Sequence, residues 1–316
     1  LRVTPRTNED INEEWISDKV RFNYDGYYQQ RIDTPYLRKN QKLENSSWEE
    51  SLKILISKLK NSRPLALIGE LVDVETGYAV KKFMSNYGNN NVECRTDNQF
   101  IHESLNSFRF NTPINIIEEA DLVLLIGANP KIETPIINHK IFKAFNNGAE
   151  VFNIGEDILL NYETKYLGKQ LTELNNEKII KSINKSKNPL IIVGSAFLNS
   201  LKNINTFKSI VSFSRKHKVI TDNKNNLNFL NPFASRVGQL LIGNTTEQNC
   251  EPFTKLTNQN FDIVLSFGSE KIVDRSFDNC FRVYFGHHGD EGAMSSDLVL
   301  PTPLFTEKNG IFVNIE

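Results

Sequence analysis

The sequence predicts an α/β protein with two Rossmann-like lobes built on mostly parallel sheets, preceded by an irregular N-terminal arm. Three observations lead to this prediction. The chain has 316 residues, about twice the usual length of one domain. Short, continuously apolar runs alternate with stretches of helical spacing, as in proteins built from βαβ units. Finally, two kinds of apolar run each occur twice, which indicates that the second lobe repeats the plan of the first.

Four buried strands are predicted from this internal repeat. The run 64–69 (PLALIG) resembles 189–194 (PLIIVG), and the run 121–127 (DLVLLIG) resembles 262–268 (DIVLSFG). Each run is rich in branched apolar residues and stops at a glycine, which is typical of a strand buried on both faces of a parallel sheet. Further strands are expected at 150–154, 218–221, 281–285 and 298–300.

Helices are expected between these runs. Apolar residues at helical spacing predict one from Ser47 or Trp48 to about Lys60, with a serine as its N-cap. Others are expected at 76–87, 135–145 and 204–216. These elements divide the chain into a docking arm (1–46), a first lobe (47–184) and a second lobe (185–316).

The arm is polar, and its aromatic residues are the candidates for docking against a larger partner. They are Trp15, Phe22, Tyr24 and Tyr27.

Composition excludes several classes of protein. The 37 Lys and Arg residues balance 38 Asp and Glu residues, for a net charge of −1, which excludes a strongly basic nucleic-acid binder. No apolar run approaches the length of about 20 residues that crosses a membrane, so any membrane association would run through a partner. The three scattered cysteines argue against a disulfide framework and are too few to hold a four-cysteine iron–sulfur cluster. They are Cys94, Cys250 and Cys280.

The glycine-terminated strands point to candidate ligand loops, because ligands of open α/β sheets bind beyond the carboxyl ends of the strands. A nucleotide phosphate could lie there, or each glycine could simply end a strand and begin a turn. No loop has the G-x-G-x-x-G or P-loop fingerprint, and Glu70 and Glu270 place carboxylates where a phosphate would lie. The loops are Gly69-Glu70, Gly127-Ala128-Asn129-Pro130, Gly194-Ser195 and Gly268-Ser269-Glu270.

Other polar groups also have a structural interpretation. The segment 287–291 (HHGDE) could supply metal ligands, but it more simply ends a strand and begins a turn, and His102, His139 and His217 have no partner at a ligand-like spacing.

Three further candidates are equally weak. Ser195 lacks a nucleophile elbow, Cys94 lacks a nearby base, and Glu118-Glu119 fits a solvated helix end. We therefore assign no catalytic, cofactor-binding or metal-ligating residue from the sequence.

Three segments carry a resemblance to a known family: 6–26 (RTNEDINEEWISDK, RF, YDG), 118–135 (EEAD, GANP, P) and 284–314 (Y, GHHGD, DLVLP, TEK, VN). Together they resemble the 75 kDa iron–sulfur subunit (the G-type subunit) of respiratory complex I, NADH:ubiquinone oxidoreductase. The GANP and D-x-V-L-P segments are shared with the wider molybdopterin oxidoreductases. The NEEW arm and the HHGD loop favour the complex I branch.

The resemblance implies a molybdopterin oxidoreductase-like fold that lacks the cofactor. The match covers part of the family's large domain, while the cluster-binding cysteines lie in an N-terminal portion that this chain does not match. In active molybdopterin enzymes, a Cys, selenocysteine or Ser ligand follows a Gly-x-Asn-Asn segment. Here the similar segment is 88–93 (GNNNVE), and the aligned position falls near Gln99, whose amide is a poor molybdenum ligand, while Cys94 comes too early.

The resemblance thus predicts a structural part of the complex I peripheral arm, supporting NADH-to-quinone electron transfer without redox centres of its own. Iron–sulfur clusters and FMN would lie elsewhere in the complex. The partners would be other peripheral-arm subunits, including an iron–sulfur-bearing portion or chain, with no nucleic acid and no direct membrane span. The expected location is the matrix side of the mitochondrial inner membrane, ahead of the bacterial cytoplasmic side.

Two alternatives stay open. The chain could be an active molybdopterin- or nucleotide-dependent oxidoreductase using a cleft between the lobes, or a binding protein that keeps a nucleotide there. The sequence also leaves open whether the chain is complete, a fragment or a split subunit, because it begins at Leu1.

Overall fold

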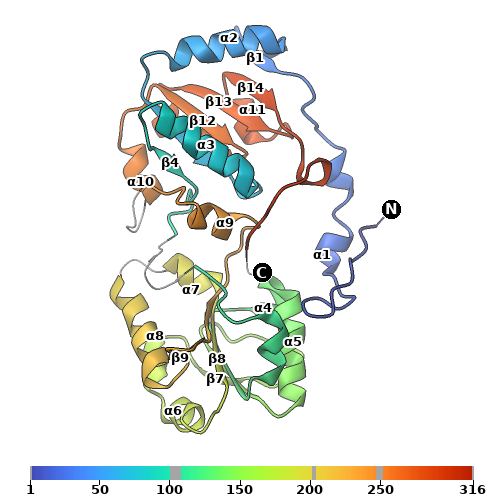
Figure 1. Ribbon diagram of the computed structural model, residues 1–316, viewed down its shortest axis with the longest axis vertical. Helices are drawn as coiled ribbons and strands as arrows, with labels where there is room; N and C mark the ends of the chain where they lie inside the picture. The colour runs from blue at the N-terminus through green and yellow to red at the C-terminus, as the bar shows by residue number, and fades with distance from the viewer. Residues whose placement is uncertain (1, 100–107, 201–203, 247–251, 315–316) are drawn as a thin grey trace. The chain divides into compact units, whose positions relative to one another are not determined.

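The computed structural model describes residues 2–99, 108–200, 204–246 and 252–314. The chain forms two compact units (Figure 1). Unit 1 comprises residues 1–24, 100–232 and 315–316, and unit 2 comprises residues 25–99 and 233–314. These units do not coincide with the lobes expected at 47–184 and 185–316, because strands from distant parts of the chain pair with one another.

Unit 2 is built on a seven-stranded sheet with the order β2-β1-β14-β13-β12-β3-β4. Strands β14, β13, β12, β3 and β4 are mutually parallel, and β1 and β2 extend the sheet in antiparallel fashion. The strands are β1 (Tyr36–Lys39), β2 (Lys42–Asn45), β3 (Pro64–Ile68), β4 (Val92–Glu93), β12 (Ile263–Phe267), β13 (Phe281–Gly286) and β14 (Leu298–Pro301).

Helices cover this sheet. Ser47 caps α2 by accepting the Glu50 backbone N–H, as expected. Helix α3 begins two residues earlier than predicted, because Asp73 caps it by accepting the Thr76 N–H; Figure 1 shows α3 crossing the front of the sheet. The helices are α2 (Trp48–Leu59), α3 (Val74–Asn86), α9 (Arg236–Leu241), α10 (Pro252–Thr257) and α11 (Glu291–Ser295), with short 3₁₀ helices η1 (Asp25–Tyr27), η5 (Glu270–Val273), η6 (Arg275–Phe277) and η7 (Phe305–Glu307).

The expectation of an irregular arm over residues 1–46 is wrong for residues 36–45. Strands β1 and β2 form a hairpin there, and β1 pairs with β14. Asn40 and Gln41, both at positive φ (49° and 66°), form its two-residue turn, a conformation typical of tight hairpins and well tolerated by Asn. Leu37 is buried and Leu43 packs against the core of unit 2.

Unit 1 is built on a five-stranded, all-parallel sheet with the order β11-β8-β5-β6-β7. The predicted strand 218–221 is displaced from this sheet: its last two residues form β9, which pairs antiparallel with β10. The edge position is taken by the fully buried β11. The strands are β5 (Leu122–Ile126), β6 (Glu150–Ile154), β7 (Lys165–Gly168), β8 (Pro189–Val193), β9 (Ile220–Thr221), β10 (Lys224–Asn225) and β11 (Leu227–Phe229).

The core of unit 1 forms where these strands meet the helices. Val123, Leu125 and Ile192 pack against Ile137 and Ile141 of α5.

The helices predicted at 135–145 and 204–216 are confirmed as α5 and α8. The helices are α1 (Asp18–Arg21), α4 (Pro130–Glu133), α5 (Pro135–Asn146), α6 (Glu177–Ile183), α7 (Ser195–Ser200) and α8 (Ile204–Lys216), with 3₁₀ helices η3 (Ile114–Glu119) and η4 (Leu171–Asn175).

The two units share one register at their centres, so the predicted repeat is structural. Pro64 of β3 lies opposite Ile263 of β12, and Pro189 of β8 lies opposite Leu122 of β5. Each unit therefore pairs one strand of each repeated kind, which explains why its segments are not contiguous in the sequence.

An aspartate fixes this register at the amino ends of the central strands. The Asp262 carboxylate accepts the backbone N–H of Arg63 at 2.7 Å, and the Asp121 carboxylate accepts that of Asn188 at 3.0 Å. In both units the acceptor precedes one central strand and the donor precedes the proline of the other. Hydrogen bonds to a charged group are stronger than neutral ones, so the aspartate of each repeat holds the two strands in alignment.

Glycines allow the backbones of the two central strands to approach closely at their carboxyl ends. A β-carbon at Gly69 would lie 2.1 Å from the carbonyl oxygen of Gly268, and one at Gly194 would lie 2.3 Å from that of Gly127. Gly127 and Gly268 also have positive φ, at 57° and 61°, which favours glycine. The close approach is backbone against backbone, so no side-chain rotation could relieve a larger residue.

Gly69→Ala should lower the free energy of unfolding by about 2–3 kcal/mol, because the added methyl group overlaps a backbone carbonyl and must displace a strand. Urea denaturation of the purified chain measures this. Gly289→Ala is the matched control, because its nearest neighbour, the Gln30 carbonyl oxygen, is 3.7 Å away. Equal effects of the two substitutions would contradict the account.

The arm residues up to 24 belong to unit 1 and attach to α5 through charge. Lys140 contacts Glu13 at 3.1 Å and Glu118 at 2.7 Å, and Lys143 contacts the same two carboxylates. The ring of Trp15 lies 5.5 Å from that of His139. Glu118 is therefore part of an ion cluster rather than a solvated helix end.

Among the predicted docking aromatics, Trp15 and Phe22 are more than half exposed, at 52% and 60%. Tyr24 and Tyr27 are half-buried. Tyr27, in unit 2, packs edge-on against Phe305 at 5.7 Å. The docking role itself stays a prediction.

Acid should detach the arm from α5. Hydrogen bonds from Lys143 and Lys140 lower the pKa of Glu13 from its ordinary 4.5 to about 2. Because the pKa is lower in the folded state, the attachment stabilises the protein above about pH 4.5 and is lost as pH falls toward 2. Trp15 fluorescence, recorded in a Trp48→Phe background, should shift to longer wavelength over that interval.

Two neutralising substitutions provide the control for this titration. Glu13→Gln should show the shifted emission already at pH 7, while Glu14→Gln, at an exposed neighbouring position, should leave it unchanged. An emission spectrum of Glu13→Gln identical to that of the parent protein would contradict the attachment.

Candidate functional site

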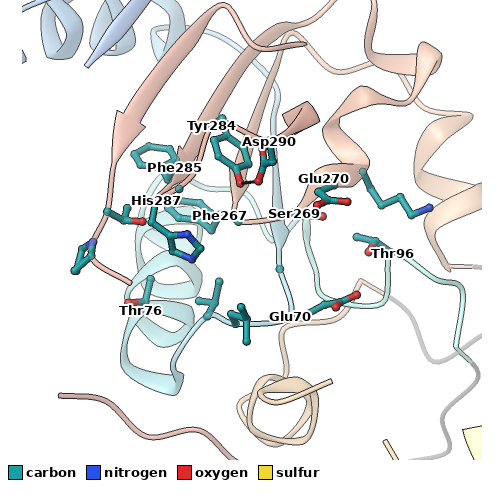
Figure 2. Close-up of a pocket in the computed structure, with 18 of the residues that line it drawn as sticks. Glu70, Thr76, Thr96, Phe267, Ser269, Glu270, Tyr284, Phe285, His287 and Asp290 are labelled. Carbon is teal, nitrogen blue, oxygen red and sulfur yellow. Dashed lines mark hydrogen bonds between the residues drawn. The ribbon is translucent and has the colours of Figure 1, made fainter. Parts of the chain in front are cut away.

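Unit 2 contains a cavity of about 390 Å³ at the carboxyl ends of its central strands (Figure 2). The chain runs from β3 to β4 on one side and from β12 to β13 on the other, so the order of strands reverses between β3 and β12. Open α/β sheets bind ligands at such a switch point. The predicted loops Gly69-Glu70 and Gly268-Ser269-Glu270 both line this cavity, so the structure brings them together.

Aromatic rings form one side of the cavity and carboxylates the other. Phe267 and Phe285, at the ends of adjacent strands, stack with centroids 4.5 Å apart and planes inclined by 8°. Figure 2 shows these rings beside His287, with Glu70 and Glu270 across the cavity from them. The site therefore combines a flat apolar surface with negative charge.

The two glutamates lack a partner within the described part of the chain, since no hydrogen bond or ion pair reaches the side chain of Glu70 or Glu270. Burial raises the pKa of Glu70, and the nearby Asp97 and Glu270 carboxylates raise it further, while Arg236 opposes them. A carboxylate in this environment is stabilised by a nearby cation or hydrogen-bond donor and is destabilised by an anion.

The HHGD loop is built around Tyr284. Its buried hydroxyl donates a hydrogen bond to Asp290, whose carboxylate also caps α11 by accepting the Ala293 N–H at 2.9 Å. Gly286 and Gly292 flank the ring, and a β-carbon at either position would lie within 2.8 Å of it. The prediction that this segment ends a strand and begins a turn is confirmed.

The two histidines of this loop form a hydrogen-bonded pair. His288 Nε2 lies 2.8 Å from the Gly26 carbonyl oxygen, and the Nδ1 atoms of His287 and His288 lie 2.5 Å apart. Burial, with help from His288 and Arg31, lowers the pKa of His287 to about 4, so its ring is uncharged at neutral pH.

The hydrogen bonds constrain the positions of the protons in this pair. A carbonyl can only accept, so His288 carries a proton on Nε2. An uncharged His288 then accepts at Nδ1 from His287. In that form His287 keeps a lone pair on Nε2, and Figure 2 shows its ring directed into the cavity. The cavity therefore gains one more hydrogen-bond acceptor.

A buried network engages Gln99, near which the resemblance to molybdopterin enzymes places the metal-ligand position. Arg236 donates to Gln99 Oε1 at 2.8 Å and to Asp97 at 2.9 Å, and both Arg236 and Gln99 are buried. Cys94 lies in the same region, and burial raises its pKa to about 12, so the thiol is protonated and a poor ligand or nucleophile, as the sequence suggested. The amide of Gln99 is thus bound by a guanidinium.

In unit 1, the loops at the corresponding strand ends are bonded by a carboxylate of the protein itself. Glu133 accepts the backbone N–H of Asn129 at 2.6 Å and that of Ser195 at 2.9 Å, so it joins the two predicted loops that follow β5 and β8. Backbone N–H groups of this kind bind phosphates in nucleotide-binding proteins. Here the protein's own carboxylate takes that place, and Ser195 acts through its backbone.

The remaining candidates from the sequence are dispersed. His217 bonds Asn184 at 2.7 Å, and the half-buried Cys280 contacts the Phe261 carbonyl oxygen. His102 and Cys250 lie outside the described residues. Within the described ranges, no group of three or more His, Cys, Asp or Glu side chains could hold a metal ion.

Sequence reasoning missed Glu133 and Arg236. Glu133 sits four residues after Asn129, so its bond to that loop could have been proposed from helical spacing. Its bond to Ser195, and the bond of Arg236 to Gln99, link residues 62 and 137 positions apart and leave no local pattern.

Two family models together match nearly all of the chain. The molybdopterin oxidoreductase family model matches residues 31–316, and a model of the 4Fe–4S domain of NADH-ubiquinone oxidoreductase NDSU1/NuoG-like proteins matches residues 1–25. The second stretch contains no cysteine.

Curated relatives include the G subunit of NADH-quinone oxidoreductase from Rickettsia bellii, 36% identical over all of this chain and 47% of the relative. The NADH-ubiquinone oxidoreductase 75 kDa subunit of Reclinomonas americana is 32% identical over all of this chain and 49% of its own length. The chain spans about half the length of these relatives. They are subunits of complex I and come from bacteria and mitochondria, as the resemblance implied.

A chain of the formyltransferase/hydrolase complex of Methylorubrum extorquens has the same fold. It superposes with a TM-score of 0.64 at 12% identity, covering 89% of this chain and 92% of that one. The predicted α/β fold of the molybdopterin oxidoreductase type is confirmed. None of the helices in the described ranges combines the length and apolar character needed to cross a bilayer.

The residues present do not suit the cofactor that this fold carries in active enzymes. Molybdopterin bears phosphate, yet Glu70 and Glu270 line the cavity of unit 2 and Glu133 holds the loop N–H groups of unit 1. Gln99, near which the resemblance places the ligand position, is a buried amide that already accepts a bond from Arg236. We therefore derive no chemical step through such a group.

Glu133→Ala should lower the free energy of unfolding by about 2 kcal/mol, because it removes two hydrogen bonds to a charged acceptor that join separate loops. Urea denaturation gives the value. Glu163→Ala is the control, since Glu163 is exposed in the same unit and should change stability by less than about 0.5 kcal/mol. If the two variants unfold alike, Glu133 does not hold these loops.

Proposed function

The chain belongs to the molybdopterin oxidoreductase family, and from this premise we propose that it is a structural part of the peripheral arm of respiratory complex I. In this role it supports electron transfer from NADH to quinone and binds no redox centre itself. The similarity to G-type and 75 kDa subunits over the full chain carries the assignment to complex I. The carboxylates and the bond between Arg236 and Gln99 at the strand ends support the structural role.

The bond between Arg236 and Gln99 is the observation that most favours a structural role. A redox site of this fold needs an anionic or soft ligand at that position, and an amide held by a buried guanidinium provides neither. The guanidinium also bonds Asp97, so charge at this place is balanced within the protein. A buried, balanced network of this kind maintains shape and offers no position for a metal.

We further propose where the chain acts and what it contacts. Its partners are other peripheral-arm subunits, among them an iron–sulfur-bearing portion or chain, and its location is the matrix side of the mitochondrial inner membrane. The exposed rings of Trp15 and Phe22 lie in the stretch that matches the 4Fe–4S domain model, which supports this end of the chain as the docking region.

Arg236→Met tests the structural role in cells that depend on this gene. Breaking a buried ion pair destabilises a protein by a few kcal/mol, so the amount of assembled complex on a blue-native gel should fall several-fold. NADH oxidation per assembled complex, normalised to FMN, should stay unchanged. Arg275→Met, at an exposed position of the same unit, should leave both quantities unchanged.

Two outcomes would contradict the proposal. A normal amount of complex with reduced turnover would assign a redox role to this region, as an active oxidoreductase requires. Migration of the parent chain alone, at about its own mass of 36.2 kDa, would exclude the complex I assignment.

A further inference from the structure

We propose that the strand-end cavity of unit 2 binds a small organic cation with a planar, apolar body, such as an amidinium, guanidinium or arylammonium compound. The cavity is formed within one unit, and the inference is independent of the assembly role proposed above. Its volume of about 390 Å³ lies within the range of small-molecule sites.

The charged side chains that line the cavity favour a cation as its ligand. Lys308 lines the cavity, but its ammonium is paired with Asp73. Asp290 is likewise engaged, by Tyr284 and by the N-terminus of α11. Among the charged lining groups this leaves Glu70 and Glu270 against Lys271, an excess of one negative charge.

The uncharged walls favour the same ligand. Phe267 and Phe285 line the cavity and stack on one another, and a cation that lies over the outer face of such a ring is attracted to it. With His288 uncharged, His287 offers a lone pair on Nε2 that accepts from an N–H donor. Aromatic surface, carboxylates and a neutral acceptor thus surround one space (Figure 2), and a flat N–H-bearing cation satisfies all three.

Three probes of one shape and different charge test this inference: benzamidine, benzamide and benzoate. Binding to the purified full chain is followed by ligand-observed NMR titration. Benzamidine should bind with a Kd on the order of 1 mM, as expected for so small a ligand, benzamide more weakly, and benzoate without saturation. Benzoate binding as tightly as benzamidine, or no saturable binding of benzamidine, would overturn the proposal.

Variants assign the binding to this cavity. Glu70→Gln and Glu270→Gln should each weaken benzamidine about three- to fivefold, the range for a partly exposed ion pair, while Lys271→Gln should strengthen it by a similar factor. Glu291→Gln, which neutralises a carboxylate next to the loop and outside the cavity lining, is the control. Thermal unfolding confirms that each variant is folded. Unchanged affinity in both Glu70→Gln and Glu270→Gln would overturn the proposal.

Discussion

The approach of two glycine-terminated strands determines the architecture of each unit. Gly69 against Gly268, and Gly194 against Gly127, bring backbone to backbone where the strand order reverses. At the opposite end an aspartate bonds the neighbouring strand and fixes its register. Because the central pair is constrained at both ends, the loops that follow it open at the same edge of the sheet, and that edge is where this fold binds ligands.

The side chains at that edge determine which ligands it can bind. In unit 1 the carboxylate of Glu133 bonds the N–H groups of both loops, and in unit 2 Glu70 and Glu270 border the cavity. Arg236 holds Gln99, near which the resemblance places a metal ligand. The fold is therefore retained while its anion-binding positions carry negative charge, which favours a structural role and, in unit 2, a ligand of opposite charge.

The sequence predicted the buried strands well, because branched apolar runs ending in glycine have few alternatives; the strand at 150–154 and the helix at 204–216 have the predicted bounds. It failed where pairing is distant. The division into contiguous lobes missed that β3 pairs with β12, and the hairpin β1–β2 was overlooked despite the Asn40-Gln41 turn. The position of the cavity depends on which strands are neighbours in the sheet, and no local sequence pattern indicates this. Its acidic character, in contrast, could be predicted from Glu70 and Glu270.

The metal content of the protein tests the central claim most directly, namely that the strand ends carry the protein's own charges in place of an anionic, metal-bearing cofactor. Molybdenum and tungsten would be measured by mass spectrometry in the chain purified, with its complex, from its own cells supplied with both metals. The account predicts neither metal above background relative to protein. A stoichiometric amount of either, released together with a pterin on denaturation, would contradict it.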